Sequence, residues 1–443
     1  MRSDRRPISE LLSGIIDYRG KTPPKSDSGV PCISAANVKN GRIDVTSTTF
    51  VSRETYDSWT TRGLPNPGDV IITTEAPVGE VAEFPGDREY LLTRRVMALQ
   101  ANPQVLAGRY LLYALQSPQT KARLLSGDRG TTVPRVLKTD ITSLEIPLPS
   151  LTEQKHIAHI LGTLDDKIEL NRRMNEMLEA IAQALFKSWF VDFDPVIDKA
   201  LAAGNPIPEP LQKRAEARQA LGDQRKPPAD SIARHFPDRF VFNEDLGWIP
   251  EGWEQTEVGE VSCCFDKKRI PLSKAERETK KPGRIPYYGA TSVMDYIDDW
   301  IFDDVYFLVG EDGSVVKEDG APFTQYIWGK TWVNNHAHVL QGAAGVATEH
   351  LMLFMRDQDV HPYVTGAVQP KINQKNLNRI PFLKASQALN EGFGEKISPL
   401  FKRTRHLSEE SQSLSALRDT LLPKLLSGEL RIPDAERQVE EAL

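Results

Sequence analysis

A few groups of side chains in this sequence have types and spacings that could support chemistry. His156 and His159 follow Glu153, and the three could bind a metal ion if one helix face carried them all. Their spacing differs from the His-Glu-x-x-His pattern of zinc enzymes, so an exposed polar helix face is the simpler interpretation. His336 and His338 would share one face of a strand, where they could bind a metal or contact a nucleic-acid base or phosphate.

The motifs that would indicate an enzyme are incomplete. Asp165-Asp166-Lys167 resembles a nuclease triplet, but it falls on the polar side of a helical pattern, as solvated charges do. Asp194-Pro195-Val196 lacks the second proline and the aromatic residue of an adenine methyltransferase motif, and there is no Gly-x-x-x-x-Gly-Lys phosphate loop. Cys263-Cys264 has no second pair to complete a zinc site. We therefore predict no catalytic residues, no metal site and no cofactor bound by this chain.

Basic and amide side chains instead gather in loops. Lys267 to Lys281 holds seven basic and two acidic residues, although the whole chain has a formal net charge of −6. Such loops can neutralise phosphates and reach base edges, while a solvated surface is the alternative for any single residue. The predicted DNA-binding residues are Arg19, Lys21, Lys25, Asn37, Arg129, Thr131, Thr132, Arg135, Lys138, Lys267, Lys268, Arg269, Tyr287, Tyr288, Thr291, Lys371, Asn373 and Lys375.

Length and composition limit the architecture that could present these loops. A chain of 443 residues exceeds the size at which one hydrophobic core stops growing, about 250 to 300 residues, so two or more domains are expected. The composition is 40% hydrophobic and 26% charged, with no run long enough to span a membrane. Three cysteines and the absence of a secretory signal predict a soluble, cytoplasmic protein.

The order of sequence features occurs twice. Gly68-Asp-Val-Ile-Ile72 and Asp304-Val-Tyr-Phe-Leu308 both read as a buried strand entering a glycine turn. Gly130-Thr-Thr-Val-Pro134-Arg135 is matched by Gly366-Ala-Val-Gln-Pro370-Lys371, and an Ile-Pro step and a long helical pattern follow each loop. Because several features recur in the same order, we infer a tandem duplication.

Two long helices separate the repeats in this pattern. The first is predicted to start near Ser150 or Thr152, with Thr152 as a possible cap, and its apolar frame runs into Asn171 and Asn175. The frame could instead shift onto Met174, Met177 and Ile181. Pro399 and Pro423 are expected to kink or end the second helix. The predicted partner-contact or helix-pairing residues are Glu153, Gln154, Ile157, Leu161, Leu164, Ile168, Leu400, Leu407, Leu414 and Leu421.

The predicted fold class is α+β, with two similar mixed α/β globules separated by two long antiparallel coiled-coil helices. A Pro-rich and Gly-rich connector with a short helix near residues 210 to 221 should join the first helix to the second globule. The expected segments are globule 1–150, helix 151–190, connector 191–245, globule 246–385, helix 386–430 and tail 431–443.

Four segments carry a resemblance to a known family. They are the run from Ile146 to Ile168, Ala184 to Pro195, Leu246 to Trp253, and Leu417 to Leu430. Together they resemble the specificity subunit of type I restriction-modification enzymes over essentially the whole chain. The second repeat departs from this pattern between Ala385 and Gly394, where it lacks the Glu-Gln of the first helix start.

This resemblance implies a non-catalytic subunit with two target recognition domains, each reading half of a split site on double-stranded DNA. It also implies two modification subunits, which would bind S-adenosylmethionine and methylate adenine, and two restriction subunits in the full complex. No membrane partner is implied.

Overall fold

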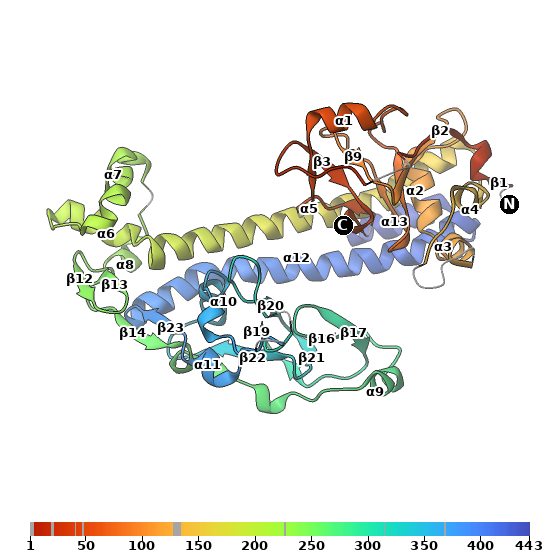
Figure 1. Ribbon diagram of the computed structural model, residues 1–443. Helices are drawn as coiled ribbons and strands as arrows, with labels where there is room; N and C mark the ends of the chain where they lie inside the picture. Colours follow the sequence, from red (N-terminus) through yellow and green to blue (C-terminus); the bar gives the residue numbers. More distant parts are fainter. Residues whose placement is uncertain are drawn as a thin grey trace. The chain divides into compact units, whose positions relative to one another are not determined.

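The computed structural model describes residues 4–18, 22–39, 41–46, 48–126, 134–225, 227–313, 315–366 and 369–443 (Figure 1). The chain divides into two compact units. Unit 1 comprises residues 1–171 and 409–443, and unit 2 comprises residues 172–408. No helix in the described ranges combines the length and apolar character needed to cross a membrane.

Unit 1 contains a four-stranded antiparallel sheet in the order β2-β10-β7-β8. Every residue of β7 is buried, as its run of β-branched residues predicts. Beside this sheet, β3 pairs with β9 in parallel and β1 pairs with β11. The strands are β1 (Arg5–Pro7), β2 (Leu12–Ile16), β3 (Val30–Ile33), β4 (Val38–Lys39), β5 (Arg42–Ile43), β6 (Phe50–Val51), β7 (Val70–Thr74), β8 (Val78–Glu83), β9 (Leu91–Leu92), β10 (Val96–Ala101) and β11 (Glu145–Pro147).

Short helices cover this sheet and pack into its core. The apolar residues of α2 join those of β7 and β10 in one cluster that also takes in the start of α5 and the end of α12. The helices are α1 (Arg53–Trp59), α2 (Gly108–Gln116), α3 (Pro118–Ser126), α4 (Lys138–Thr142), the N-terminal part of α5 (Leu151–Phe186), the C-terminal part of α12 (Gln387–Ser427) and α13 (Ile432–Ala442). The segment expected to be a tail is thus mostly α13, with Ala435 and Val439 buried.

Unit 2 repeats this topology with different strands. Its main sheet has the order β15-β22-β19-β20, β16 pairs with β21 in parallel, and β14 pairs with β23. The strands are β12 (Phe240–Asn243), β13 (Gly247–Pro250), β14 (Glu254–Glu257), β15 (Ser262–Cys264), β16 (Ile285–Tyr288), β17 (Val293–Ile297), β18 (Phe302–Asp303), β19 (Tyr306–Gly310), β20 (Thr324–Ile327), β21 (Lys330–Val333), β22 (Ala337–Gly342) and β23 (Pro381–Lys384). The helices specific to unit 2 are α6 (Asp194–Ala203), α7 (Gln212–Ala220), α8 (Asp230–Ala233), α9 (Lys274–Thr279), α10 (Thr348–Arg356) and α11 (Gln374–Asn378).

The matching strand orders confirm the duplication inferred from the sequence. We call the segment from β1 to β11 repeat 1 and the segment from β14 to β23 repeat 2. In this correspondence β7 matches β19, β10 matches β22 and α2 matches α10.

The start of α5 is fixed by Ser150 and Gln154. The Ser150 hydroxyl accepts the Glu153 N–H at 3.3 Å, and the Glu153 carboxylate accepts the Ser150 N–H at 3.0 Å. This capping box makes Ser150 the cap, so the alternative Thr152 is wrong. Gln154 is 1% exposed, accepts the Ala107 N–H and donates to the Val105 and Pro149 carbonyls. Its side chain holds α5 to repeat 1, and the expected partner contact by Gln154 is wrong.

The start of α12 shows how repeat 2 replaces the missing glutamine. Asn390 is fully buried and donates to the Ala385 carbonyl five residues earlier, as Gln154 donates to Pro149. The helix then continues to Ser427 through Pro399 and Pro423. The expectation that a proline ends this helix is therefore wrong.

Asn171 and Asn175 in the first helix both have hydrogen-bond partners; Asn171 is buried and Asn175 is half-buried. Asn171 is 1% exposed and donates to Glu410 at 2.9 Å and Ser411 at 3.3 Å, and in unit 2 Asn175 donates to Ser408 at 3.0 Å. Met177 is 65% exposed and Ile181 is 44% exposed. The register that places Asn171 and Asn175 among the pairing residues of the first helix is therefore confirmed. The alternative register on Met174, Met177 and Ile181 is wrong.

The apolar helix-pairing residues follow the same frame. Ile157, Leu161, Leu164, Leu414 and Leu421 are buried in the unit 1 core, where Ile168 packs against them. In unit 2, Leu407 is buried and Leu400 packs against the core.

The connector is folded into unit 2. Its helix α7 lies where the sequence indicates a short helix, and Arg214 pairs with both carboxylate oxygens of Asp194 at 2.7 Å. Asp194 is 3% exposed, and Phe193 and Phe236 belong to the unit 2 core.

Candidate nucleic-acid interface

In repeat 1 the residues around the predicted basic loop meet at one corner of the main sheet. The Thr74 N–H donates to the Arg95 carbonyl at 2.9 Å, and the Val136 N–H donates to the Thr74 carbonyl at 3.0 Å. Glu75 and Arg135 form an isolated antiparallel bridge. The Glu75 carboxylate also pairs with the Arg95 guanidinium at 3.0 Å. We call this group the repeat 1 corner.

Repeat 2 has a corner with the same backbone hydrogen bonds. The Glu311 N–H donates to the His336 carbonyl at 2.8 Å, and the Ile372 N–H donates to the Glu311 carbonyl at 2.9 Å. Asp312 and Lys371 form the isolated bridge, and the Asp312 carboxylate contacts His336 Nδ1 at 2.6 Å. The repeat 2 corner therefore matches the repeat 1 corner in its bridge, its acidic residue and its basic residues.

A buried charged cluster lies behind the repeat 2 corner. His338 is 1% exposed; its Nδ1 lies 2.5 Å from Asp266, and its Nε2 lies 2.8 Å from the Ile372 carbonyl oxygen. Each ring nitrogen of His338 therefore lies against an oxygen atom, one from a carboxylate and one from a backbone carbonyl. Glu311 pairs with Arg269 at 2.7 Å and with Lys371 at 3.0 Å.

The two carboxylates of this cluster are held in the charged form. Burial alone would raise the pKa of Asp266, but the hydrogen bond and charge of His338 and the Val339 N–H keep that pKa below its usual range. Burial likewise acts against ionisation of Glu311, but Arg269 and Lys371 lower the pKa of this carboxyl. Arg269, a predicted DNA-binding residue, thus pairs with buried carboxylates inside repeat 2.

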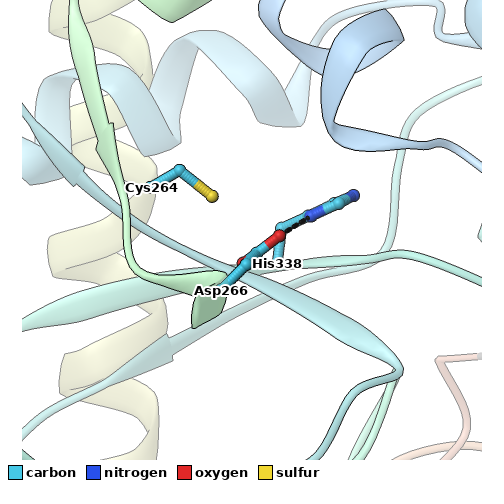
Figure 2. Close-up of side chains that lie close together, drawn as sticks. All are labelled: Cys264, Asp266 and His338. Carbon is cyan, nitrogen blue, oxygen red and sulfur yellow. Dashed lines mark hydrogen bonds and ion pairs between the residues drawn. The ribbon is translucent and has the colours of Figure 1, made fainter. Parts of the chain in front are cut away.

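Cys264, Asp266 and His338 have donor atoms within 4.8 Å of one another, the separation that a metal site would need (Figure 2). Burial raises the pKa of the Cys264 thiol to about 12, which disfavours the thiolate that binds metals. Both nitrogens of His338 already have partners. The arrangement therefore fits a hydrogen-bonded core better than a metal site. His336 and His338 do not share a strand face, because His336 lies before β22 and is exposed.

The remaining predicted residues of repeat 1 have different environments. Lys25 and Arg135 are exposed, and Lys138 starts α4 and is half-buried. Asn37 is 5% exposed, with its amide donating to the Asp44 carbonyl and its oxygen accepting the Ser34 N–H, so its role is structural and the predicted base contact is wrong. Arg19, Lys21, Arg129, Thr131 and Thr132 lie outside the described residues.

In repeat 2 four exposed candidates lie on three segments. Lys267, Lys268 and Thr291 are exposed, as is Lys375 on α11. Tyr287 is 1% exposed and its hydroxyl accepts the Leu272 N–H, so this side chain belongs to the core and the predicted contact is wrong. The half-buried candidates are Tyr288 and Asn373, which caps α11 by accepting the Asn376 N–H.

Comparisons with known proteins agree with this duplicated architecture. A family model described as "Type I restriction modification DNA specificity domain" matches residues 12–180 and 250–383, one match for each repeat. The chain belongs to this family. Its function is accordingly DNA sequence specificity.

The relatives match over most of their lengths. The HindI specificity subunit of Haemophilus influenzae is 26% identical over 388 residues, covering 77% of this chain and 81% of that protein. The MjaIX specificity subunit of Methanocaldococcus jannaschii is 24% identical over 387 residues, covering 83% and 78%. A crystal structure of the S subunit from M. genitalium matches with a TM-score of 0.46 and 17% identity over 95% of both chains.

In this specificity subunit, one residue of each corner falls outside the list of predicted DNA-binding residues. Arg95 and His336 each pair with the acidic residue of their corner; the sequence indicated His336 only as a candidate metal ligand or nucleic-acid contact, and it did not indicate Arg95. The parallel pairs Ile33 with Leu92 and Tyr288 with Val333 show that these residues occupy the same turn in the two repeats. Aligning the repeats beyond their glycine and proline motifs could have found them.

Proposed function

We propose that this chain reads a bipartite DNA site, with one half-site for each repeat, and performs no catalysis itself. The observation that carries the proposal is the duplicated corner. Two segments far apart in the sequence build the same backbone hydrogen bonds and place a basic side chain, Arg135 or Lys371, at the same position. Basic side chains supply phosphate contacts, and base contacts supply specificity.

The two long helices would set the distance between the half-sites. In unit 1, Asp165 pairs with Arg418 at 2.6 Å and Asn171 with Ser411 at 3.3 Å, and in unit 2 Asn175 pairs with Ser408 at 3.0 Å. The residue numbers rise along α5 and fall along α12, which supports an antiparallel coiled coil. The 36 residues of α5 correspond to a helix of about 54 Å at a rise of about 1.5 Å per residue.

The catalytic partners are part of the same proposal. Two modification subunits would bind S-adenosylmethionine and methylate adenine, and two restriction subunits would join them in the full complex. This chain would supply the recognition surfaces and the scaffold, which is consistent with a sequence that holds no complete methyltransferase or phosphate-loop motif.

The test is reconstitution with and without the modification subunit. Plasmid DNA is incubated with S-adenosylmethionine, and methylated adenines are mapped by sequencing. We expect methylation only when both proteins are present, in a motif of two defined halves separated by a fixed gap. Methylation or cleavage by the homogeneous chain alone, or a single continuous motif, would contradict the proposal.

A further inference from the structure

The turn that leads into β10 in repeat 1 and the turn that leads into β22 in repeat 2 share a backbone hydrogen bond. The Thr93 N–H donates to the Ile33 carbonyl at 2.9 Å, and the Asn334 N–H donates to the Tyr288 carbonyl at 3.1 Å. β10 and β22 begin three residues later in each case. The turns Thr93–Arg95 and Asn334–His336 are therefore equivalent, position by position.

In each turn the third side chain is held by its corner. Arg95 pairs with Glu75 at 3.0 Å, and His336 pairs with Asp312 at 2.6 Å. The first residue of the second turn is also fixed, because Asn334 is 3% exposed and its side-chain oxygen accepts the His336 N–H at 2.8 Å. Both ends of this turn are therefore anchored.

The middle position is different. Arg94 and Asn335 are both exposed. In the described ranges, neither side chain has a hydrogen bond or an ion pair. Each is the middle residue of its turn. The last residue of the turn pairs with an acidic residue, Glu75 or Asp312, and that acidic residue forms the backbone bridge to Arg135 or Lys371. In both repeats the turn thus carries one exposed polar side chain whose next residue along the chain is paired with the acidic residue of the corner.

The chemistry of these two side chains is complementary to different bases. An arginine guanidinium donates two hydrogen bonds to O6 and N7 of guanine, and an asparagine amide exchanges two hydrogen bonds with N6 and N7 of adenine in the major groove. A solvated surface would explain either side chain alone. It does not explain why the same anchored position carries a base-reading side chain twice.

We propose that Arg94 reads a guanine in the half-site of repeat 1 and that Asn335 reads an adenine in the half-site of repeat 2. This inference rests on the proposed function, because it assigns single bases within the bipartite site. The neighbouring Arg135 and Lys371 contact phosphates and set the register in which the two turns meet the base edges.

The experiment maps methylated adenines in cells that express the chain with its modification subunit. Arg94→Ala should lower the discrimination for guanine at one position of one half-site by roughly tenfold to a hundredfold, leaving the other half unchanged. Asn335→Ala should do the same for an adenine in the other half. Arg403→Ala, which removes an exposed arginine from α12, is the matched control and should leave the motif unchanged.

Exchange variants make the test independent of total activity. Arg94→Gln should shift the preference from guanine to adenine, and Asn335→Arg should shift it from adenine to guanine. If a variant methylates too little DNA to map, competition between duplexes that differ at one base measures the same preference on the purified complex.

An unchanged motif for both alanine variants would overturn the inference, as would an equal loss of methylation at every site. Either result, obtained while the unaltered complex gives a bipartite motif, leaves the proposed function standing. A continuous motif from the unaltered complex would reject the proposed function itself.

Discussion

The corners of the two repeats share a backbone but differ in their interiors. The strand pairing places Met97 of β10 where β22 has His338, and Thr74 where repeat 2 has Glu311. Repeat 1 thus packs an apolar side chain behind its corner, whereas repeat 2 buries an ion cluster. Because both interiors support the same hydrogen bonds, the corner depends on strand register and tolerates changes in side-chain chemistry. This tolerance lets a duplicated frame carry two different recognition surfaces.

A buried ion cluster is a costly way to fill this space. Removing two charges from water costs several kcal/mol for each ion, and only well-formed hydrogen bonds offset that cost. The second repeat meets this condition, since Asp266 accepts from both His338 and the Val339 N–H. Each corner should therefore respond differently when one side chain behind it is removed.

The largest expected effect comes from moving the two repeats relative to each other. Four residues inserted into α5 after Lys167 should lengthen the helix by about 6 Å, or nearly two base pairs at about 3.4 Å each. They also rotate the helix by about 40° beyond a full turn, so partial loss of affinity is expected. Mapping methylated adenines should show both half-sites unchanged and a longer gap. An active variant with the original gap, or with altered bases, would show that the helices do not set the spacing.

The second largest expected effect is a loss of stability that distinguishes the repeat 2 corner from the repeat 1 corner. His338→Met, which installs the residue found in repeat 1, should destabilise the protein by about 1–3 kcal/mol, because Asp266 and the Ile372 carbonyl lose a buried donor while Arg269 still pairs with Asp266 at 3.2 Å. Adding Asp266→Ala should cost less than the sum of the two single changes. Chemical unfolding of the full chain measures these free energies. Additive effects would mean that His338 and Asp266 do not form a coupled pair.

A smaller difference concerns α2 and α10, where Tyr110 and His350 occupy matching buried positions. Tyr110 donates to the Pro147 carbonyl, whereas neither nitrogen of His350 has a hydrogen-bond partner. Burial lowers the pKa of His350 to about 3, while an unfolded chain has a histidine pKa near 6.5. The stability that depends on neutral His350 is therefore complete above about pH 6.5 and is lost as the pH falls, by up to about 1.4 kcal/mol per pH unit.

Unfolding midpoints at pH 7 and pH 5.5 measure this dependence. His350→Phe should flatten it, since phenylalanine takes up no proton in either state. Tyr110→Phe is the matched change in repeat 1 and should lower stability equally at both pH values. A pH dependence that survives in His350→Phe would assign it to other groups.

The sequence predicts the features that depend on local patterns. Glycine and proline positions locate the strands β7 and β19, and apolar spacing locates α5 and α12, because turns and amphipathic faces are encoded within a few residues. The asparagine frame remained ambiguous, since the partners of Asn171 lie about 240 residues away in the sequence. Asn37 and Tyr287 were misassigned because residue type does not reveal burial.

The candidate site was predicted only in part for the same reason. Arg135 and Lys371 follow recognisable loops, so the sequence identified them. Arg95 and His336 acquire their roles from strands that pair across the sheet, with Glu75 and Asp312 as partners. The shared strand register of the two repeats makes that equivalence visible.

The central claim is that each repeat reads its own half of the DNA site, and Arg135→Ala compared with Lys371→Ala tests it most directly. Binding of the assembled complex to duplexes altered in one half-site is measured at several salt concentrations. If both side chains contact phosphates, each change should weaken binding to all sequences and flatten the salt slope by about one; a base contact should instead relax one position, in a different half for each variant, by about 1 to 3 kcal/mol. Unchanged binding by both variants at every salt concentration, or relaxation of the same half-site by both, would contradict the account.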